Sequence, residues 1–434
     1  MTPDSTSVLP EPASETLPTR GLPRGVRQFL HTESAGGILL LLAAAIALIW
    51  ANSPVAESYT RFWHTELAFE AGGIRRSIDL QHFVNEALMA LFFFVVGLEI
   101  KRELVVGELR TWKRAALPAF AALGGMVVPA ALFLAINIGG PGSRGWGVPM
   151  ATDIAFAIGV VALLGSRVPA TLKIFLLTLA IVDDIGAIVV IAVVYSGQVS
   201  FMALAVAGLA LLVMGALRFV RVDWMPGFVI LGVVVWLAVY ESGVHATIAG
   251  VVLGLLAPAR PLAPTDLARE WADDLADEPT PAELRTMTTI ANATVSVAER
   301  LEHLLHPFTS FVVIPIFALA NAGVRIEASA LGVPGASRVI TGVVVGLIVG
   351  KLAGITLFSW AALRLRIGAL PDGVRGTHLA GAAALAGIGF TVSLFIAGLA
   401  FPTPELEAAA KIGILGASAL ASGLGYMILR LTPD

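Results

Sequence analysis

Two adjacent aspartates lie within an otherwise apolar stretch, Leu176–Ile188, which reads Leu-Leu-Thr-Leu-Ala-Ile-Val-Asp-Asp-Ile-Gly-Ala-Ile. Apolar runs of about 20 residues span the hydrocarbon of a bilayer. An ionisable side chain inside such a run costs several kcal/mol unless it is paired, hydrated or neutralised. Asp183 and Asp184 therefore decide two things at once: the stretch predicts a membrane helix, and the carboxylates predict a functional site within it.

The composition of the whole chain favours the same class. Apolar residues make up 57% of the 434 residues and charged residues 14%, which is more apolar surface than a soluble core absorbs. The net charge of −3 gives no sign of a nucleic-acid partner, and the absence of cysteine excludes disulfides and thiolate chemistry. We expect an all-α polytopic membrane protein, in contact with membrane lipid, with about twelve transmembrane segments: 35–52, 82–100, 115–137, 148–165, 172–196, 200–217, 226–241, 243–257, 308–324, 339–362, 377–400 and 408–429.

The basic residues predict the orientation of these segments. Of the 28 Lys and Arg residues, twenty fall on the side of the N-terminus and seven on the other side, while Lys351 lies within a span. Cytoplasmic loops carry the excess of positive charge, so both termini are expected in the cytoplasm. Residues 1–30 read as a disordered tail, and 31–430 as one transmembrane domain. That domain includes a 53–80 outer loop with a small hairpin, and a 258–307 inner loop with an amphipathic helix after an acidic stretch.

Two more charges lie deep in apolar segments, Asp153 and Lys351. One carboxylate and one lysine could simply form a buried ion pair. Three carboxylates against one lysine leave an excess that protons or a metal cation must compensate, so a cation path is the favoured interpretation. Neighbouring helix residues point about 100° apart, so Asp183 and Asp184 should have different roles.

Two of the segments look interrupted near the middle of the membrane. One carries Gly147, Pro149 and Thr152, and the other carries Gly387–Thr391. Broken helices present carbonyls and helix ends that hold ions at the midplane. Close helix packing through small residues explains the same glycines equally well.

The residues around these charges resemble those of the NhaA-type sodium/proton antiporters, over about residues 30–430. The matching stretches are Val96–Glu103, Ala151–Ala157, Leu179–Ala187, Ser242–Gly250, Arg300–Pro307, Gly350–Lys351 and Gly387–Ser393. The resemblance implies inverted repeats with two broken helices crossing at the midplane, an architecture already described for this family. It also implies electrogenic exchange of sodium, and of lithium, for protons, with no cofactor. The sequence departs from the family pattern at Asn85-Glu86, where Asn-Asp is usual.

Roles for individual residues follow from that resemblance. Asp184 would be the main ion-binding carboxylate, with Asp183 beside it and salt-bridged to Lys351, so that Na+ binds at the two aspartates. Thr152 and Asp153 would lie where the broken helices cross. Residues expected in the cytoplasmic funnel or in the pH response are Glu99, Glu103, His245, Glu302, His303 and His306. The resemblance further implies a bacterial inner-membrane location and a homodimer formed through the 53–80 loop.

Three other functions are compatible with parts of this pattern. An intramembrane aspartyl protease also uses two aspartates, here Asp153 and Asp183, but its usual Tyr-Asp and Gly-x-Gly-Asp contexts are absent. A retinal protein could use Lys351 to form the Schiff base, but twelve spans are too many for such a protein. Sodium-coupled solute symport on a related fold is the serious alternative, although the interior offers few polar groups for a solute.

Overall fold

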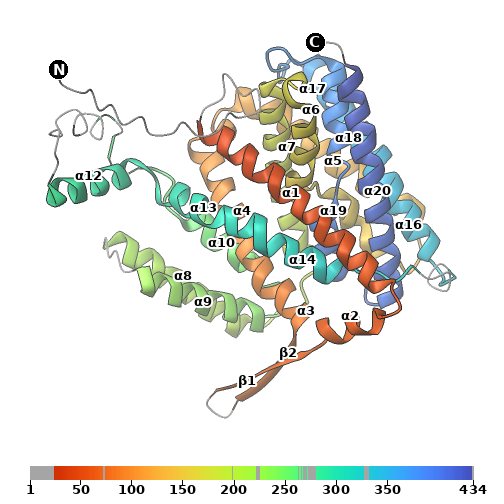
Figure 1. Ribbon diagram of the computed structural model, residues 1–434, viewed down its shortest axis with the longest axis horizontal. Helices are drawn as coiled ribbons and strands as arrows, with labels where there is room; N and C mark the ends of the chain where they lie inside the picture. Colours follow the sequence, from red (N-terminus) through yellow and green to blue (C-terminus); the bar gives the residue numbers. More distant parts are fainter. Residues whose placement is uncertain are drawn as a thin grey trace, which may run out of the picture.

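The computed structural model is a helical bundle with one small hairpin (Figure 1). It describes residues 24–432 except 72–73, 198, 221–224, 262, 265, 267–270, 272–279 and 327–331, so most of the predicted disordered tail and of the acidic stretch lies outside the described residues. The elements are α1 Arg24–Ala51, α2 Ala56–Trp63, β1 Glu66–Ala71, β2 Ile74–Asp79, α3 Leu80–Phe83, η1 Val84–Leu88, α4 Met89–Val105, η2 Glu108–Arg110, α5 Trp112–Asn137, η3 Ser143–Met150, α6 Ile154–Leu164, η4 Gly165–Arg167, α7 Ala170–Val194, α8 Phe201–Phe219, α9 Met225–Glu241, α10 Thr247–Leu256, α12 Pro281–Thr294, α13 Val297–Phe308, η5 Thr309–Val313, α14 Ile314–Asn321, α16 Ala336–Val345, η6 Gly346–Gly350, α17 Lys351–Arg364, α18 Gly376–Leu385, α19 Phe390–Ala400 and α20 Pro404–Leu431.

The helices are long and apolar enough for a multi-pass membrane protein. Among the described residues, eight helices can cross a membrane, or up to ten if each of two bent pairs is one span. The predicted count of twelve is not confirmed, because α9 and α10 are shorter apolar helices. The segment predicted at 308–324 also begins earlier. The amphipathic helix α13 continues through η5 into α14, and together they form one candidate span, Val297–Asn321.

The hairpin defines one end of the bundle. Strands β1 and β2 pair antiparallel, with Glu66 opposite Asp79, and they project beyond the helices at the bottom of Figure 1. Helix α4 runs away from this hairpin end towards the opposite end of the bundle. We call that opposite end, on the side of Glu99, the vestibule end. The predicted hairpin in the 53–80 loop is therefore present, preceded by the short helix α2.

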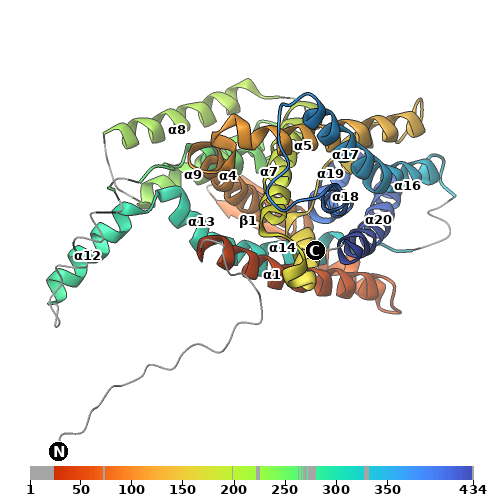
Figure 2. The same cartoon turned by 90° about the horizontal axis from the view of Figure 1, so that it is seen from above.

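Small residues bring the central helices close together. A side chain at Gly124 of α5 would collide with the backbone of Gly354 in α17, and the converse holds for Gly354. Glycines at such contacts let membrane helices approach closely. Helix α17 begins at Lys351, so this packing fixes the lysine against α5. Figure 2 shows α5 and α17 side by side, and α7 packs against α5.

Three π-helical turns, η1, η5 and η6, interrupt the central helices. Such turns occur often at functional sites because they shift the register of the residues that follow. Turn η6 directly precedes Lys351, and its glycines Gly346 and Gly350 lie against Pro149 and Pro129. The proline and glycine contacts thus set the direction in which Lys351 enters the core.

Candidate functional site

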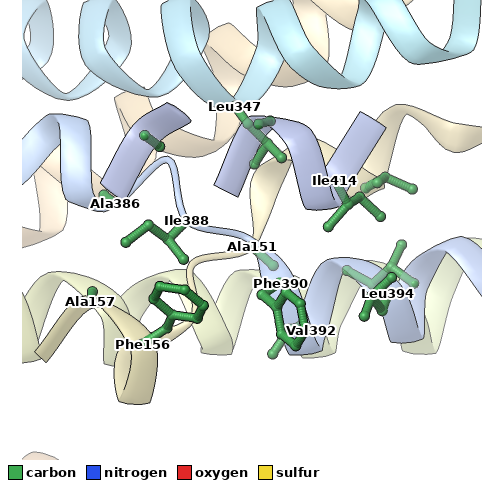
Figure 3. Close-up of a cluster of buried hydrophobic side chains, with 14 of the residues drawn as sticks. Ala151, Phe156, Ala157, Leu347, Ala386, Ile388, Phe390, Val392, Leu394 and Ile414 are labelled. Atoms are coloured by element: carbon green, nitrogen blue, oxygen red, sulfur yellow. The ribbon is translucent and has the colours of Figure 1, made fainter. Parts of the chain in front are cut away.

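Two helices are broken in the middle of the bundle, and the links at the two breaks meet. Residues between η3 and α6 are extended at Ala151 and Asp153, and α18 and α19 meet at an angle of 46°. The backbone N–H of Asp153 donates to the carbonyl of Ile388 at 2.6 Å, which joins the two segments at their crossing. Figure 3 shows Ala151 and Ile388 near this point, with apolar side chains such as Phe156, Phe390 and Leu347 around it.

Asp153 caps both of the half-helices that start at the crossing. Its Oδ1 accepts from Phe156 N in the first turn of α6 at 3.0 Å. Its Oδ2 accepts from the backbone N–H of Thr391 at 3.0 Å and from the Thr391 hydroxyl at 2.7 Å, in the first turn of α19. Helix N-termini carry partial positive charge, so one carboxylate stabilises two of them.

Lys351 and Asp183 form a fully buried ion pair. Lys351 Nζ donates to Asp183 Oδ2 at 2.5 Å and to Thr152 Oγ1 at 2.9 Å, and neither charged side chain is exposed. The Thr152 hydroxyl lies 2.7 Å from Asp183 Oδ2 and 3.0 Å from the carbonyl oxygen of Ala386. Its single proton can serve only one of these acceptors at a time, so the cluster offers two alternative hydrogen-bond arrangements.

Asp184 points elsewhere, into a cavity. The cavity is lined by Asp184, Thr152, Asp153, Ile154, Ala155, Thr391 and Val392 at its inner end, and by Phe92, Val95, Val96, Glu99, His306, Thr309, Ser310 and Ile314 along its wall. Asp184 is 5% exposed, and its Oδ1 has no hydrogen-bond partner. The two neighbouring aspartates are thus separated: Asp183 is held by Lys351 through Oδ2, and Asp184 lines the cavity, while the Oδ1 atom of each is buried without a hydrogen-bond partner.

Predicted pH-response residues gather at the vestibule end of this cavity. Glu99 and His306 line its wall. One turn further along, Arg102 Nη1 donates to Glu302 Oε1 at 2.7 Å, and its Nη2 lies 3.5 Å from Glu103 Oε1. The structure therefore brings Glu99, Glu103 and Glu302 into one neighbourhood.

His245 lies apart from this group, towards the hairpin end. Its Nδ1 is 3.7 Å from Glu86 Oε1, and its Nε2 is 3.0 Å from the carbonyl oxygen of Tyr195. Burial lowers the pKa of His245, but the hydrogen bond and negative charge of Glu86 and the Tyr195 carbonyl outweigh it, so the pKa is raised above the ordinary histidine value. Glu86 also accepts from Ala246 N at 3.2 Å, at the start of α10.

Three partners were not singled out from the sequence: Thr391, Arg102 and Glu86. Thr391 follows the Gly387-Ile-Gly string, where a polar residue beside a helix break was a usable signal. Glu86 stood out only as a departure from the family pattern, and neither it nor Arg102 could be assigned a partner, because their partners are distant in the chain. Among the described residues, no group of three or more His, Cys, Asp or Glu side chains converges as a metal site.

Comparison with known proteins identifies the family. The model for "Na+/H+ antiporter 1" matches residues 27–429. The chain belongs to this family of sodium/proton antiporters. It is 48% identical over 408 residues to "Na(+)/H(+) antiporter NhaA 3" of Frankia alni, covering 94% of this chain and 88% of that one. It is 46% identical to the NhaA of Rhodopirellula baltica (96% and 97% covered) and 43% identical to that of Shewanella loihica (95% and 98%).

Family membership bears on the competing interpretations. The relatives are transporters and not enzymes, so the resemblance noted in the sequence is confirmed and the protease interpretation is not supported. Solute symport is likewise not supported, because the relatives that this chain matches over nearly their full length are named as antiporters.

Proposed function

We propose that this protein is an electrogenic antiporter that exports sodium, and also lithium, in exchange for protons. The observation that carries the proposal is the Asp184 carboxylate, which lines the same cavity as Glu99 and has one buried oxygen without a hydrogen-bond partner. Hard cations prefer oxygen ligands. Thr152 and Asp153 line the same end of the cavity, and their side-chain oxygens could complete a transient sodium site with Asp184.

Competition at one carboxylate is enough to couple the two ions. A carboxylate must lose its proton before it binds a metal cation, so sodium and protons exclude each other at Asp184. If the loaded site is then exposed to the other side of the membrane, each bound sodium ion is traded for protons. Alternating access supplies this exposure, and the crossed half-helices are the elements that carry the site.

Lys351 and Asp183 give the exchange its net charge movement in this proposal. They are buried together, with Thr152 between them and the cavity. Lys351 acts as salt bridge and proton carrier, and Asp183 joins the sodium site when the lysine releases it. Because more than one group can give up a proton when sodium binds, more protons enter than sodium ions leave.

The setting of the transporter is part of the proposal. We place it in the bacterial inner membrane with both termini in the cytoplasm, on the strength of the basic residues on the N-terminal side. The vestibule end of the bundle then faces the cytoplasm. Glu103, His245 and Glu302 tune the response to pH. The hairpin, whose outer edges carry unpaired backbone groups, would pair with a second copy of the chain.

The test is sodium-driven proton movement in vesicles that contain the purified protein and no organic solute. The wild type should move protons in response to sodium alone, whereas a symporter would move ions only when its solute is present. Asp184→Asn should abolish the movement while the variant still inserts in the membrane. The matched control is Asp372→Asn, which changes an exposed aspartate in the 365–375 loop and should leave transport unchanged. Normal exchange by Asp184→Asn would remove the basis of the proposal.

A further inference from the structure

Two residues with hydroxyl groups lie on the cavity wall and take no part in the exchange proposed above. Thr309 and Ser310, which we call the hydroxyl pair, belong to the π-helical turn η5, and they are 2% and 3% exposed. The other wall residues, on α4, α13 and α14, are apolar apart from Glu99 and His306. Polar groups at a π-helical turn within an apolar span are typical of a functional position.

Contacts at both ends of the bundle fix the depth of the hydroxyl pair. At the vestibule end Arg102 pairs with Glu302, and towards the hairpin end Asn321 donates to Asn85. The helical run that contains α4 and the run that contains α13, η5 and α14 are therefore antiparallel. This register places the hydroxyl pair about one helical turn further into the bundle than Glu99.

The hydrogen bond of Thr309 leaves its oxygen suited to bind a cation. The hydroxyl donates to the carbonyl oxygen of His306 at 2.9 Å. A hydroxyl has one proton and two lone pairs, so after this bond only lone pairs remain to interact with a further group. Hard cations prefer oxygen ligands. The Thr309 side chain can therefore act as a neutral ligand for sodium.

Helix packing explains the small size of Ser310 but not the two oxygens. A side chain on Gly36 of α1 would lie 3.2 Å from Ser310 Cβ, so α1 packs closely against this turn. Alanine in place of Ser310 would allow the same approach, and valine would fill the same volume as Thr309. The hydroxyl groups thus add nothing that the close packing requires.

We propose that the hydroxyl pair forms an outer sodium position, on the path that leads from Glu99 to Asp184. This inference rests on the proposed function, because it takes the cavity as the path of the ion. Sodium that enters the cavity loses part of its hydration shell, and protein oxygens replace the lost water. Thr309 is a direct ligand, and Ser310 adds a second oxygen beside it. The outer position lowers the sodium concentration that loads the cavity.

Sodium binding can be measured without transport. A ligand that binds only the folded protein raises its unfolding temperature. The purified protein is unfolded by heat in detergent while sodium chloride replaces choline chloride at constant ionic strength, and the half-saturating sodium concentration is read from the shift. Thr309→Val keeps the volume and removes the oxygen, whereas Thr309→Ser keeps the oxygen.

The matched control is Thr178→Val. The Thr178 hydroxyl also donates to a carbonyl of its own helix, that of Ile174, at 2.9 Å. Thr178 is 3% exposed, close to the value for Thr309, but it does not line the cavity. Loss of a buried hydroxyl as such therefore affects both valine variants alike, and only loss of a sodium ligand separates them.

The outer sodium position predicts that Thr309→Val raises the half-saturating sodium concentration about tenfold, which corresponds to about 1.4 kcal/mol of binding free energy. Thr309→Ser and Thr178→Val should match the wild type. An unchanged concentration in Thr309→Val overturns the inference, and so do an equal rise in Thr309→Ser and a wild type that sodium does not stabilise. If Thr309→Val does not fold, Thr309→Ala is read in the same ways. Normal exchange by Asp184→Asn would strike the proposed function, whereas this experiment follows binding and can fail while that test succeeds.

Discussion

Replacing Lys351 by methionine should leave a buried negative charge without its partner. Methionine keeps an apolar stem of similar length, so the change removes the ammonium group with little loss of packing. Asp183 then loses a 2.5 Å hydrogen bond and the only cation next to it among the described residues. Both side chains are fully buried, so water cannot replace the lost interaction.

The expected loss is large because the pair is buried. Breaking a buried pair by removing one partner costs about 3–5 kcal/mol of unfolding free energy. Asp183→Asn should also destabilise the protein, because it leaves Lys351 with only the Thr152 hydroxyl. The double variant has no uncompensated charge, so its loss should fall below the sum of the single losses by about 2–3 kcal/mol. Unfolding by denaturant in detergent micelles, followed by tryptophan fluorescence, measures all three variants.

A second lysine pair provides the control. Lys411 Nζ lies 2.7 Å from Glu407 Oε1 one turn away on α20, and the pair reaches solvent through Glu407, whose side chain is 27% exposed, whereas that of Lys411 is 9% exposed. Partly solvated pairs contribute about 0–1 kcal/mol, so Lys411→Met should be tolerated. Additive losses for Lys351→Met and Asp183→Asn would refute the coupling, and equal losses for Lys351→Met and Lys411→Met would refute the role of burial.

Two further predictions concern the helix cap and the histidine. Thr391→Val removes the hydroxyl donor to Asp153 Oδ2 and should lower the free energy of unfolding by about 1.5–3 kcal/mol, as expected for a hydrogen bond to a charged group, in the same denaturation assay; a loss below about 0.5 kcal/mol would contradict the cap. The raised pKa of His245 means that its pairing with Glu86 stabilises the fold fully below the unfolded value of about 6.5, and that this stabilisation is lost as the pH rises through the folded pKa. His245→Gln should therefore destabilise the protein at acid pH and match the wild type at strongly alkaline pH, and a loss that is constant across this range would show that the charge of His245 is not responsible.

Local sequence was enough to predict the central residues of the candidate site. Asp183 and Asp184 stand out because ionisable residues are rare in apolar runs, and the 100° step between helix neighbours predicts that they face different ways. In the structure, Asp183 meets Lys351 and Asp184 faces the cavity. The glycine and proline residues that break the two helices were also visible in the sequence.

Contacts between distant parts of the chain could not be predicted in this way. Asp153 and Thr391 are 238 residues apart, and Arg102 and Glu302 are 200 apart. Nothing in the neighbourhood of Arg102 says which of several glutamates it will meet. Only the folded arrangement of α4 against α13 settles that choice.

The predicted helix boundaries differ from those in the structure for another reason. Hydropathy predicted that a span starts near residue 308, because α13 has a polar face. In the structure the helical backbone continues from α13 through η5 into α14. Similarly, α9 and α10 are apolar helices, with Glu241 at the end of α9, yet they are too short to count as full spans. Hydropathy reports the surroundings of side chains, whereas helix ends depend on backbone hydrogen bonds.

The most direct test of the central claim, competition between sodium and protons at Asp184, is the onset pH of exchange measured across a wide range of sodium concentrations. At low pH protons occupy the carboxylate, and saturating sodium should displace them. The account predicts that the onset moves to lower pH as sodium rises, and that it does so equally in wild type and in His245→Gln. An onset that stays fixed across the sodium range, and moves only when Glu103, His245 or Glu302 is replaced, would contradict it.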